Sequence, residues 1–457
     1  MQETDSQDDP NLTPTLSPAG KHPYAVFRNA DFVRYLIARF IAAFGMQMLV
    51  TALDWELYKR AHSGLALGFV GLSLMVPMFL CTLPAGQLAD RRNRKSIILG
   101  STLVLALTSL GLTLTSAFIP LDKNIATFQF CAYSLLVVVG TARTFLWPAS
   151  AAFVTALVSR EELPRAITFN SGAFQISCVL GPFAAGLVIW LTHGAWLVYA
   201  INVVAGIVCF FLVSGVRHEH KLPPKEPVSL KTLITGFQFV YQNKIILGTI
   251  SLDLFAVLLG GAVTLLPIFA EDIIPLHYGT SGLGLGLLRT AIPIGAIVCM
   301  FVIAHRPPLQ KAGRTMLWCV AFFGVATILF GLANQQCLGR FIHVPDRVWF
   351  WVAFAWLAVC GMVDNVSVIV RATLVQILTP DKKRGRVSAV NSLFIGTSNE
   401  MGGFESGVTQ DLFGPVMGNS MATGAILSTV VGGFGTILVV LAVAWIWPEI
   451  RRYGKLT

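Results

Sequence analysis

Long apolar segments recur along the whole chain and constrain its fold more than any other feature. Many are at least as long as the roughly 20 helical residues that cross the hydrocarbon core of a bilayer. Only 12% of the 457 residues are charged, whereas soluble domains have about 25%. In lipid, the backbone N–H and C=O groups must form hydrogen bonds within their own helix or within a closed β-barrel. The sequence therefore predicts an all-α polytopic membrane protein.

The apolar segments predict twelve transmembrane helices. An even number of spans places both termini on the same side of the membrane. The predicted spans are 32–57, 66–86, 97–118, 128–152, 165–191, 195–214, 245–270, 282–304, 315–333, 348–376, 387–411 and 422–447.

Lysine and arginine are distributed unevenly between the two sides of these spans. Of the 33 in the chain, 23 fall on the side of the termini. Basic residues concentrate in cytoplasmic loops, so both termini are expected in the cytoplasm. The other side holds Lys59, Arg60, Lys123, Arg340 and Arg347, and the spans themselves hold Arg34, Arg39, Arg143, Arg289 and Arg371.

The longest internal loop, residues 215–244, divides the spans into six plus six. Within it, "SLKTLITGFQFVYQNK" has apolar residues at helical spacing, which predicts a helix on the inner membrane surface. The halves also share short matches, such as "RAITFNS" at 165–171 and "RVSAVNS" at 386–392, which indicate a duplication. The expected parts are a disordered cytoplasmic tail (1–26), an N-terminal half (27–214), a linker (215–244), a C-terminal half (245–447) and a second cytoplasmic tail (448–457).

A basic loop, "GQLADRRNRK", lies between the second and third spans. Its pattern at Gly86, Asp90, Arg91 and Arg94, together with the twelve spans and the long central loop, resembles the major facilitator superfamily. Asn93 stands where that family usually has Gly, and Asn tolerates a positive φ, so the turn is expected to be preserved. Gly86 is expected to permit a close helix approach.

The resemblance implies two pseudo-symmetric six-helix halves. It also implies that the basic loop is a conformational latch, which joins the halves on the cytoplasmic side in the outward-open state. The alternatives are a plain positive-inside anchor or, least favoured, a nucleic-acid contact. The stretch "RGRVSAVNSLFIGTSNEMGGFESG" at 384–407 resembles the enterobactin exporter-like group. This chain has Gly403 at a position where that group is expected to have Glu.

The fifth span contains "SCVLGPFAAGL". Gly181, Pro182 and Gly186 resemble the family's antiporter motif, which implies export. The same small residues would also make a plain helix-packing face.

Charged side chains inside spans are costly and indicate functional sites. The candidates for the proton and substrate pathway are Arg143, Asp253, Arg289, Asp364, Arg371, Glu400 and Glu405. Arg143 and Asp364 occupy equivalent places in the two halves, so they are candidates for a pair that forms in one state. Separate local partners are the alternative.

Two expectations concern carboxylates near the helix ends. Asp54, Glu56 and Asp411 lie near the outer ends of their spans, where they are expected to be solvated. In the eleventh span, Glu400, Phe404, Gly407 and Asp411 share one helical face, and Glu405 lies off it.

The remaining features exclude several classes of function. No phosphate-binding loop and no Cys/His metal-ligand spacing are present, so no enzyme activity, metal or other cofactor is expected, and a proton gradient is the expected energy source. The eight cysteines are interpreted mainly as small hydrophobic residues.

The sequence therefore predicts a multi-pass transporter of the bacterial inner (plasma) membrane. It would export an amphipathic small molecule, siderophore or drug-like, by proton antiport. Its expected partners are that substrate and the phospholipid bilayer, with no nucleic acid, and a monomer is expected. The alternatives are a uniporter of lipid or solute with the same fold, and a membrane sensor or accessory subunit that does not transport.

Overall fold

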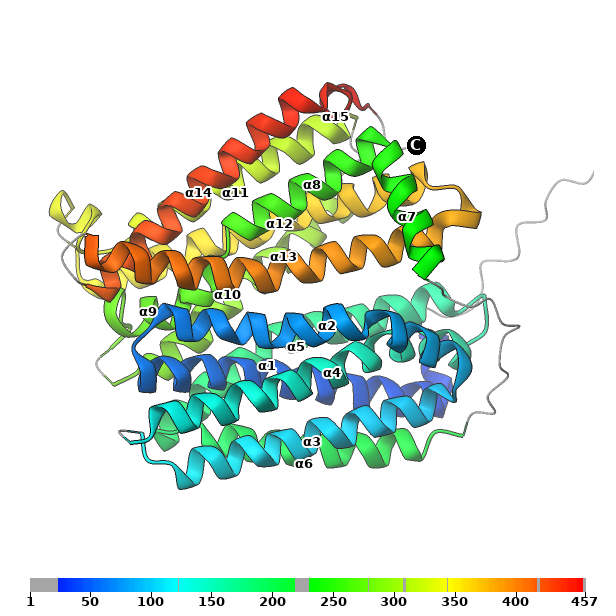
Figure 1. Ribbon diagram of the computed structural model, residues 1–457, viewed down its shortest axis with the longest axis horizontal. Helices are drawn as coiled ribbons and strands as arrows, with labels where there is room; N and C mark the ends of the chain where they lie inside the picture. The colour runs from blue at the N-terminus through cyan, green and yellow to red at the C-terminus, as the bar shows by residue number, and fades with distance from the viewer. Residues whose placement is uncertain are drawn as a thin grey trace, which may run out of the picture.

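A computed structural model describes residues 24–121, 123–217, 230–277, 279–306, 310–342, 344–416 and 420–454, and within these ranges the regular secondary structure is entirely helical (Figure 1). Residues 1–23 of the expected tail lie outside the described residues, as do residues 218–229 of the expected linker and residues 455–457 at the carboxyl end.

The N-terminal half begins with a 3-10 turn and contains six long helices. They are η1 (Ala25–Arg28), α1 (Ala30–Ala61), α2 (Gly64–Arg91), α3 (Arg94–Phe118), α4 (Ile125–Leu157), α5 (Leu163–Thr192) and α6 (Trp196–Ser214).

The C-terminal half follows a connecting helix, α7 (Leu230–Gln242). Its elements are α8 (Lys244–Leu259), η2 (Ala262–Leu265), α9 (Leu266–Ile268), η3 (Phe269–Ile273), α10 (Ser281–Ala304), α11 (Ala312–Leu332), η4 (Leu338–Arg340), α12 (Asp346–Leu378), α13 (Asp381–Val416), α14 (Met421–Ile446) and α15 (Pro448–Arg452).

These helices confirm the predicted all-α membrane fold. Among the described residues, eleven helical segments are long and apolar enough to cross a membrane. The eleventh predicted span corresponds to α13, which is long enough to cross a membrane but more polar than these eleven segments and includes Glu400, Glu405 and Asp411. A total of exactly twelve spans therefore stays a prediction.

The seventh predicted span, 245–270, is broken rather than continuous. Its α-helix ends at Leu259, and the chain continues as a 3-10 turn, a short α-helix and a π-helical turn. Gly260 and Gly261 lie at the break, where a Cβ on Gly261 would be 2.6 Å from the carbonyl oxygen of Gly402. The glycine pair lets this backbone lie directly against α13.

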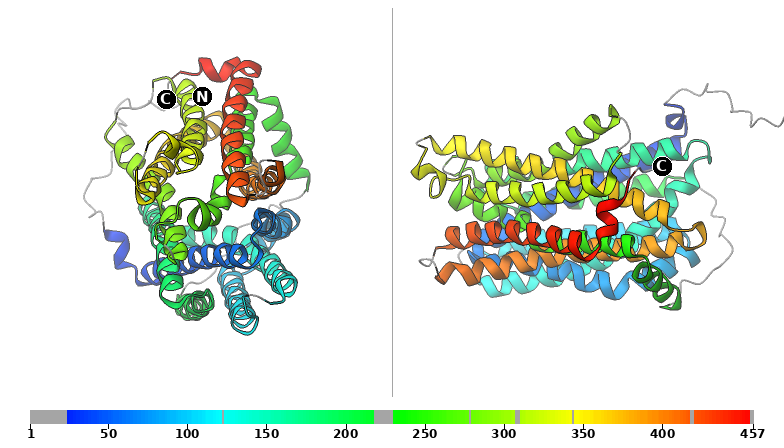
Figure 2. Two further views of the ribbon diagram at one scale, coloured as in Figure 1. Left: turned by 90° about the vertical axis from the view of Figure 1, so that its left-hand side faces the viewer. Right: turned by 90° about the horizontal axis from the view of Figure 1, so that it is seen from above.

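The two halves lie side by side, with the N-terminal half below and the C-terminal half above in Figure 1. They meet mainly through two helix pairs, α2 with α13 and α5 with α10. The view along the bundle in Figure 2 shows the helices of each half grouped on their own side of this boundary. The largest apolar cluster contains residues of both halves, including Leu49, Leu266 and Phe269.

The start of α1 and the end of α14 lie at the same end of the bundle, at the right in Figure 1, which we call the terminus end. There η1 precedes α1, and α15 follows α14. The connecting helix α7 is also at this end and packs on α13, where Phe237 and Phe394 are 5.7 Å apart between ring centroids. We call the opposite end the far end.

The charge asymmetry predicts that the terminus end faces the cytoplasm. In a cysteine-free background, single cysteines at Ser159 and Gly454 should resist a membrane-impermeant thiol reagent in intact cells. A cysteine at Gln336, an exposed residue at the far end, should react. All three should react after the membrane is permeabilised. Labelling of position 159 or 454 from outside intact cells would contradict this orientation.

Candidate functional site

Glycines bring α2 of the N-terminal half against α13 of the C-terminal half. A Cβ on Gly71 would lie 2.5 Å from the carbonyl oxygen of Glu400, and one on Gly407 would lie 2.4 Å from that of Gly64. The Phe404 ring packs edge-on against Phe69, with 5.7 Å between centroids. The shared face predicted for α13 is confirmed, and it is the face that contacts α2.

The predicted antiporter motif forms the second contact between the halves. A Cβ on Gly186 of α5 would lie 2.5 Å from the carbonyl oxygen of Gly282 in α10. A Cβ on Gly286 would in turn lie 2.6 Å from the carbonyl oxygen of Pro182. Gly181 faces α1, where its Cβ would meet Gln47 at 2.6 Å. Close packing alone therefore accounts for the small residues of this motif.

We expect Gly186→Ala to separate α5 from α10 at the far end. The added methyl group would overlap backbone, which costs about 1–3 kcal/mol in a well-packed contact. A cost of that size changes a conformational ratio by about 5- to 150-fold. Spin labels at Lys123 and Gln336 would report a longer distance between the halves at this end.

Gly172 provides a matched control on the same helix. A Cβ added there would meet nothing within 4 Å, so Gly172→Ala should leave the spin-label distance unchanged. An equal change in both variants would contradict a specific role for the Gly186 contact.

An ion pair between Asp54 of α1 and Arg289 of α10 crosses the boundary between the halves. Their side chains are 7% and 10% exposed. Thr51, one turn earlier on α1, is 3.4 Å from the Arg289 guanidinium. The expectation that Asp54 is solvated is therefore wrong, because the opposite half covers it and supplies its counter-charge.

Further polar contacts join the halves toward the far end. Tyr58 donates to Asp272, Lys59 pairs with Glu271, and Trp55 Nε1 is 3.1 Å from Ser281 Oγ. Where α2 meets α13, Ser63 Oγ at the start of α2 donates to Asp411 Oδ2 of α13 at 2.9 Å. Asp411 is only half-buried. The structure is therefore closed at its far end.

We expect Asp54→Asn to weaken this closure. The change leaves a buried guanidinium without its counter-charge, and breaking one side of a buried pair costs about 3–5 kcal/mol. The distance between spin labels at Lys123 and Gln336 should lengthen, and the exchanged pair D54R/R289D should recover part of the closed population. If the effects of Asp54→Asn and Arg289→Gln simply add in the double variant, the two residues are not coupled.

Glu56 forms a separate ion pair inside the N-terminal half. Arg60 Nη2 is 2.6 Å from Glu56 Oε1, and both side chains are 2% exposed or less. Tyr199 and Ser116 donate to the same carboxylate at 3.0 and 2.8 Å. The expectation that Glu56 is solvated is wrong, because α1, α3 and α6 together satisfy it. This fully bonded pair fits a structural role.

The middle of the bundle holds the pair that we call the central pair, Arg143 of α4 and Glu400 of α13. The Glu400 carboxylate interacts electrostatically with Arg143 and with Asp54. Glu400 is half-buried and lies 19 residues from the start of α13, or about 28 Å along the helix at 1.5 Å per residue. It is thus too deep for its side chain to reach either end of the helix.

A third group, which we call the inner triad, lies within the C-terminal half. Arg371 Nη1 of α12 is 2.6 Å from Asp253 Oδ1 of α8. Asp364, two turns before Arg371 on α12, interacts electrostatically with both. The structure thus brings Arg143 within electrostatic range of Glu400, and Arg371 within range of Asp364. Among the described residues, it does not pair Arg143 with Asp364 in this state.

Glu405 belongs to none of these groups. Its carboxylate Oε2 is 3.5 Å from the hydroxyl of Ser406, its neighbour in the chain. As predicted, it lies off the face through which α13 contacts α2.

The predicted latch is only partly described. The side chains of Asp90 and Arg91 lie outside the described residues, so the latch stays a prediction. Arg94 Nη1 donates to the carbonyl oxygen of Ala152 at 3.1 Å, within its own half. A Cβ on Gly86 would meet nothing within 4 Å, so the expected close approach is absent in this state.

Asn93 differs from the expectation of a positive φ. Its φ is −62°, and its side chain accepts a hydrogen bond from the backbone amide of Lys95 at 2.9 Å. Asn93 is the N-cap of α3, a position that Asn favours for its short side-chain acceptor.

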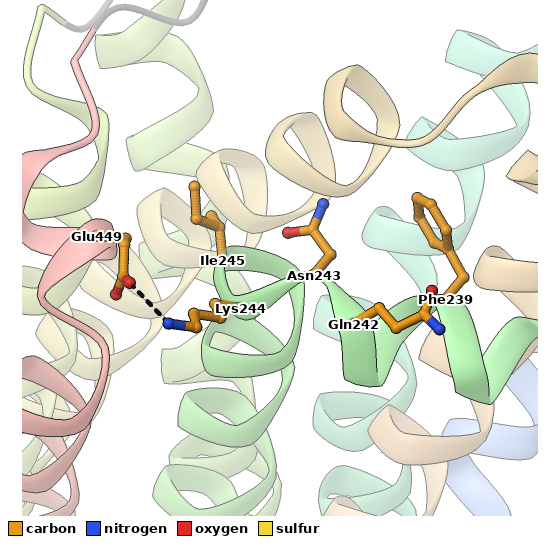
Figure 3. Close-up of a pocket in the computed structure, with 6 residues that line it drawn as sticks. All are labelled: Phe239, Gln242, Asn243, Lys244, Ile245 and Glu449. Atoms are coloured by element: carbon orange, nitrogen blue, oxygen red, sulfur yellow. Dashed lines mark hydrogen bonds and ion pairs between the residues drawn. The ribbon is translucent and has the colours of Figure 1, made fainter.

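Two surface hollows lie toward the terminus end and contain none of the predicted pathway residues. One, of about 370 Å³, is lined by the end of α7, the start of α8 and α15 (Figure 3). Lys244 Nζ is 3.5 Å from Glu449 Oε1 there. A backbone hydrogen bond and the Lys244 ammonium lower the pKa of Glu449. The other, of about 470 Å³, is an apolar groove between α1 and α5.

Comparison with known proteins assigns this arrangement to a family. The family model of the Major Facilitator Superfamily matches residues 35–403, which is most of the chain. The chain belongs to the major facilitator superfamily. It is therefore a transporter rather than an enzyme and a multi-pass membrane protein.

The chain is similar to curated and solved members of this superfamily. It is 24% identical to the enterobactin exporter EntS of Shigella flexneri over 93% of each chain. Its fold matches a point mutant of the nucleoside transporter NupG, with a TM-score of 0.70, 12% identity, and coverage of 91% of this chain and 100% of NupG. It also matches a bacterial homologue of the lysosomal transporter Spinster, solved inward-facing and unoccupied, with a TM-score of 0.68, 14% identity, and coverage of 95% and 98%.

Proposed function

We propose that this protein exports an amphipathic small molecule, a siderophore or a drug-like compound, across the bacterial inner membrane in exchange for protons. The similarity to enterobactin exporters along 93% of the chain supports the substrate class and the direction. Gly181, Pro182 and Gly186 resemble the family's antiporter motif, but helix packing also explains them, so they do not decide between exchange and uniport.

The observation that carries proton exchange is the position of Glu400. It lies on the face of α13 that contacts α2, so it sits at the boundary that must open and close during alternating access. Its counter-charge Arg143 belongs to the other half. Movement of the halves would therefore change how well the Glu400 carboxylate is paired, and an unpaired buried carboxylate binds a proton.

The state described by the structure fits one stage of this cycle. With the terminus end in the cytoplasm, a closed far end would be the outer end, as in an inward-facing or an occluded transporter. Opening toward the outside then requires the Asp54–Arg289 pair and the Lys59–Glu271 pair to separate. The cost of breaking these contacts would be offset by new contacts between the halves at the cytoplasmic end, where the predicted latch of Gly86, Asp90, Arg91 and Arg94 lies.

We expect Glu400→Gln to retain substrate binding but to uncouple transport from the proton gradient. Glutamine keeps the size and hydrogen-bonding capacity of the side chain but cannot exchange a proton. The purified protein should be reconstituted into liposomes, and enterobactin-driven proton release should be measured at equal folded amounts. The variant should release at least tenfold fewer protons than the wild type while downhill enterobactin flux continues.

Glu162→Gln provides a control, since this carboxylate lies in the loop between α4 and α5 at the terminus end. It should release protons like the wild type. Undiminished proton release by Glu400→Gln would remove Glu400 from the mechanism. Wild-type enterobactin flux without any proton movement would instead indicate uniport.

A further inference from the structure

The charges of the inner triad do not balance. Two carboxylates, Asp253 and Asp364, share one guanidinium, that of Arg371. Arginine stays protonated in proteins. If both carboxylates were ionised, the group would hold an uncompensated negative charge within the membrane-spanning part of the C-terminal half, which is unfavourable. One carboxylate is therefore stabilised by binding a proton.

The geometry shows which carboxylate keeps its charge. Asp253 bonds directly to Arg371, and their side chains are 7% and 9% exposed. Asp364 makes no hydrogen bond or ion pair with any of the described residues, and it is only half-buried. Asp253 is therefore held as the ionised partner, and Asp364 is the carboxyl group that can gain and lose a proton.

A buried hydroxyl group lies on the same helical face. Ser367 follows Asp364 by three residues and precedes Arg371 by four, so the three side chains share one face of α12. Ser367 is 0% exposed, and within the described part of the chain its Oγ has no hydrogen-bond partner. A hydroxyl can accept from a protonated carboxyl group and donate to an ionised one, so it suits both states of Asp364.

The other titratable groups around Asp364 are thiols. Cys360 lies one turn earlier on α12, Cys299 of α10 bonds to the backbone at Val366, and Cys319 of α11 lies near Cys299. A free thiol is mostly protonated at neutral pH, and burial away from water disfavours the thiolate further. Burial likewise favours a proton on an incompletely paired carboxylate, so the triad carboxylates are the groups here that can exchange one.

We propose that the inner triad is a second proton-binding site, separate from Glu400, in which Asp364 takes up and releases one proton. Arg371 keeps Asp253 ionised, and Ser367 is a positioning residue for the Asp364 carboxyl group. The step transfers only a proton, from hydronium to a carboxylate oxygen and back to water. The proposal rests on proton exchange as the proposed function and adds a site to it.

The site can be tested without any transport. Infrared difference spectra of the full-length protein in lipid nanodiscs, recorded between about pH 5 and pH 9, should contain the carbonyl band of a protonated carboxyl group. Asp364→Asn should remove one such band. Glu400→Gln should leave that band in place, because Glu400 belongs to a different group. A band that persists in folded Asp364→Asn would overturn the proposal.

Ser367→Ala provides a test that keeps both carboxylates. It should shift the frequency of the Asp364 band without reducing its area, because it removes the hydroxyl group to which the protonated carboxyl group would bond. An unshifted band in folded Ser367→Ala would overturn the positioning role and the site, even if Asp364→Asn did not fold. Wild-type protein that shows the Asp364 band but no enterobactin-driven proton release would leave this site standing and contradict the proposed exchange.

Discussion

The two halves of this transporter meet backbone against backbone, and the rest of the site depends on that contact. Where α2 crosses α13 and α5 crosses α10, a single Cβ on Gly71, Gly186 or Gly407 would lie within 2.5 Å of a carbonyl oxygen. Small residues let helices in lipid approach closely and gain dispersion contacts. The same closeness places charged side chains of one half within reach of the other, as Asp54 and Arg289 show. A wider boundary would leave these charges without partners in a medium that does not solvate them.

Charged groups then occupy successive depths along and beside this boundary. The Asp54–Arg289 pair lies toward the far end, Arg143 and Glu400 lie near the middle, and the inner triad lies toward the terminus end within the C-terminal half. The electrostatic interaction of Glu400 with Asp54 links the first two groups. A proton on Glu400 would therefore change the balance around the pair that closes the far end. In the proposed exchange, this arrangement would connect protonation to the movement of the halves without any long mechanical pathway.

The sequence was sufficient to predict the helices but not the partners of their charged residues. Apolar length alone placed most spans within a few residues, because lipid forces backbone groups to bond within a helix. Burial of Asp54 and Glu56 was missed, since both lie near a helix end where solvent was the simpler expectation. Their partners come from other elements, and no local spacing shows that Tyr199 reaches Glu56. The break at Gly260 and Gly261 had a local signal, a glycine pair inside an apolar run, but its cause is the nearby backbone of α13.

The short matches between the halves predict a duplication, yet the buried charges of the two halves differ in kind. In the N-terminal half, the Glu56–Arg60 pair is balanced, and tyrosine, serine and two backbone carbonyls complete its hydrogen bonds. Changing its protonation would break several bonds at once, so this pair stabilises a fixed structure. In the C-terminal half, the inner triad has two carboxylates and one guanidinium, so it carries one net negative charge when both carboxylates are ionised. The nearby Ser367 hydroxyl group has no hydrogen-bond partner among the described residues. Adding a proton there completes the charge balance instead of disrupting it. In the proposed exchange, one half would stay fixed while the other half responds to protons, because a single additional carboxylate would change a structural ion pair into a group that titrates.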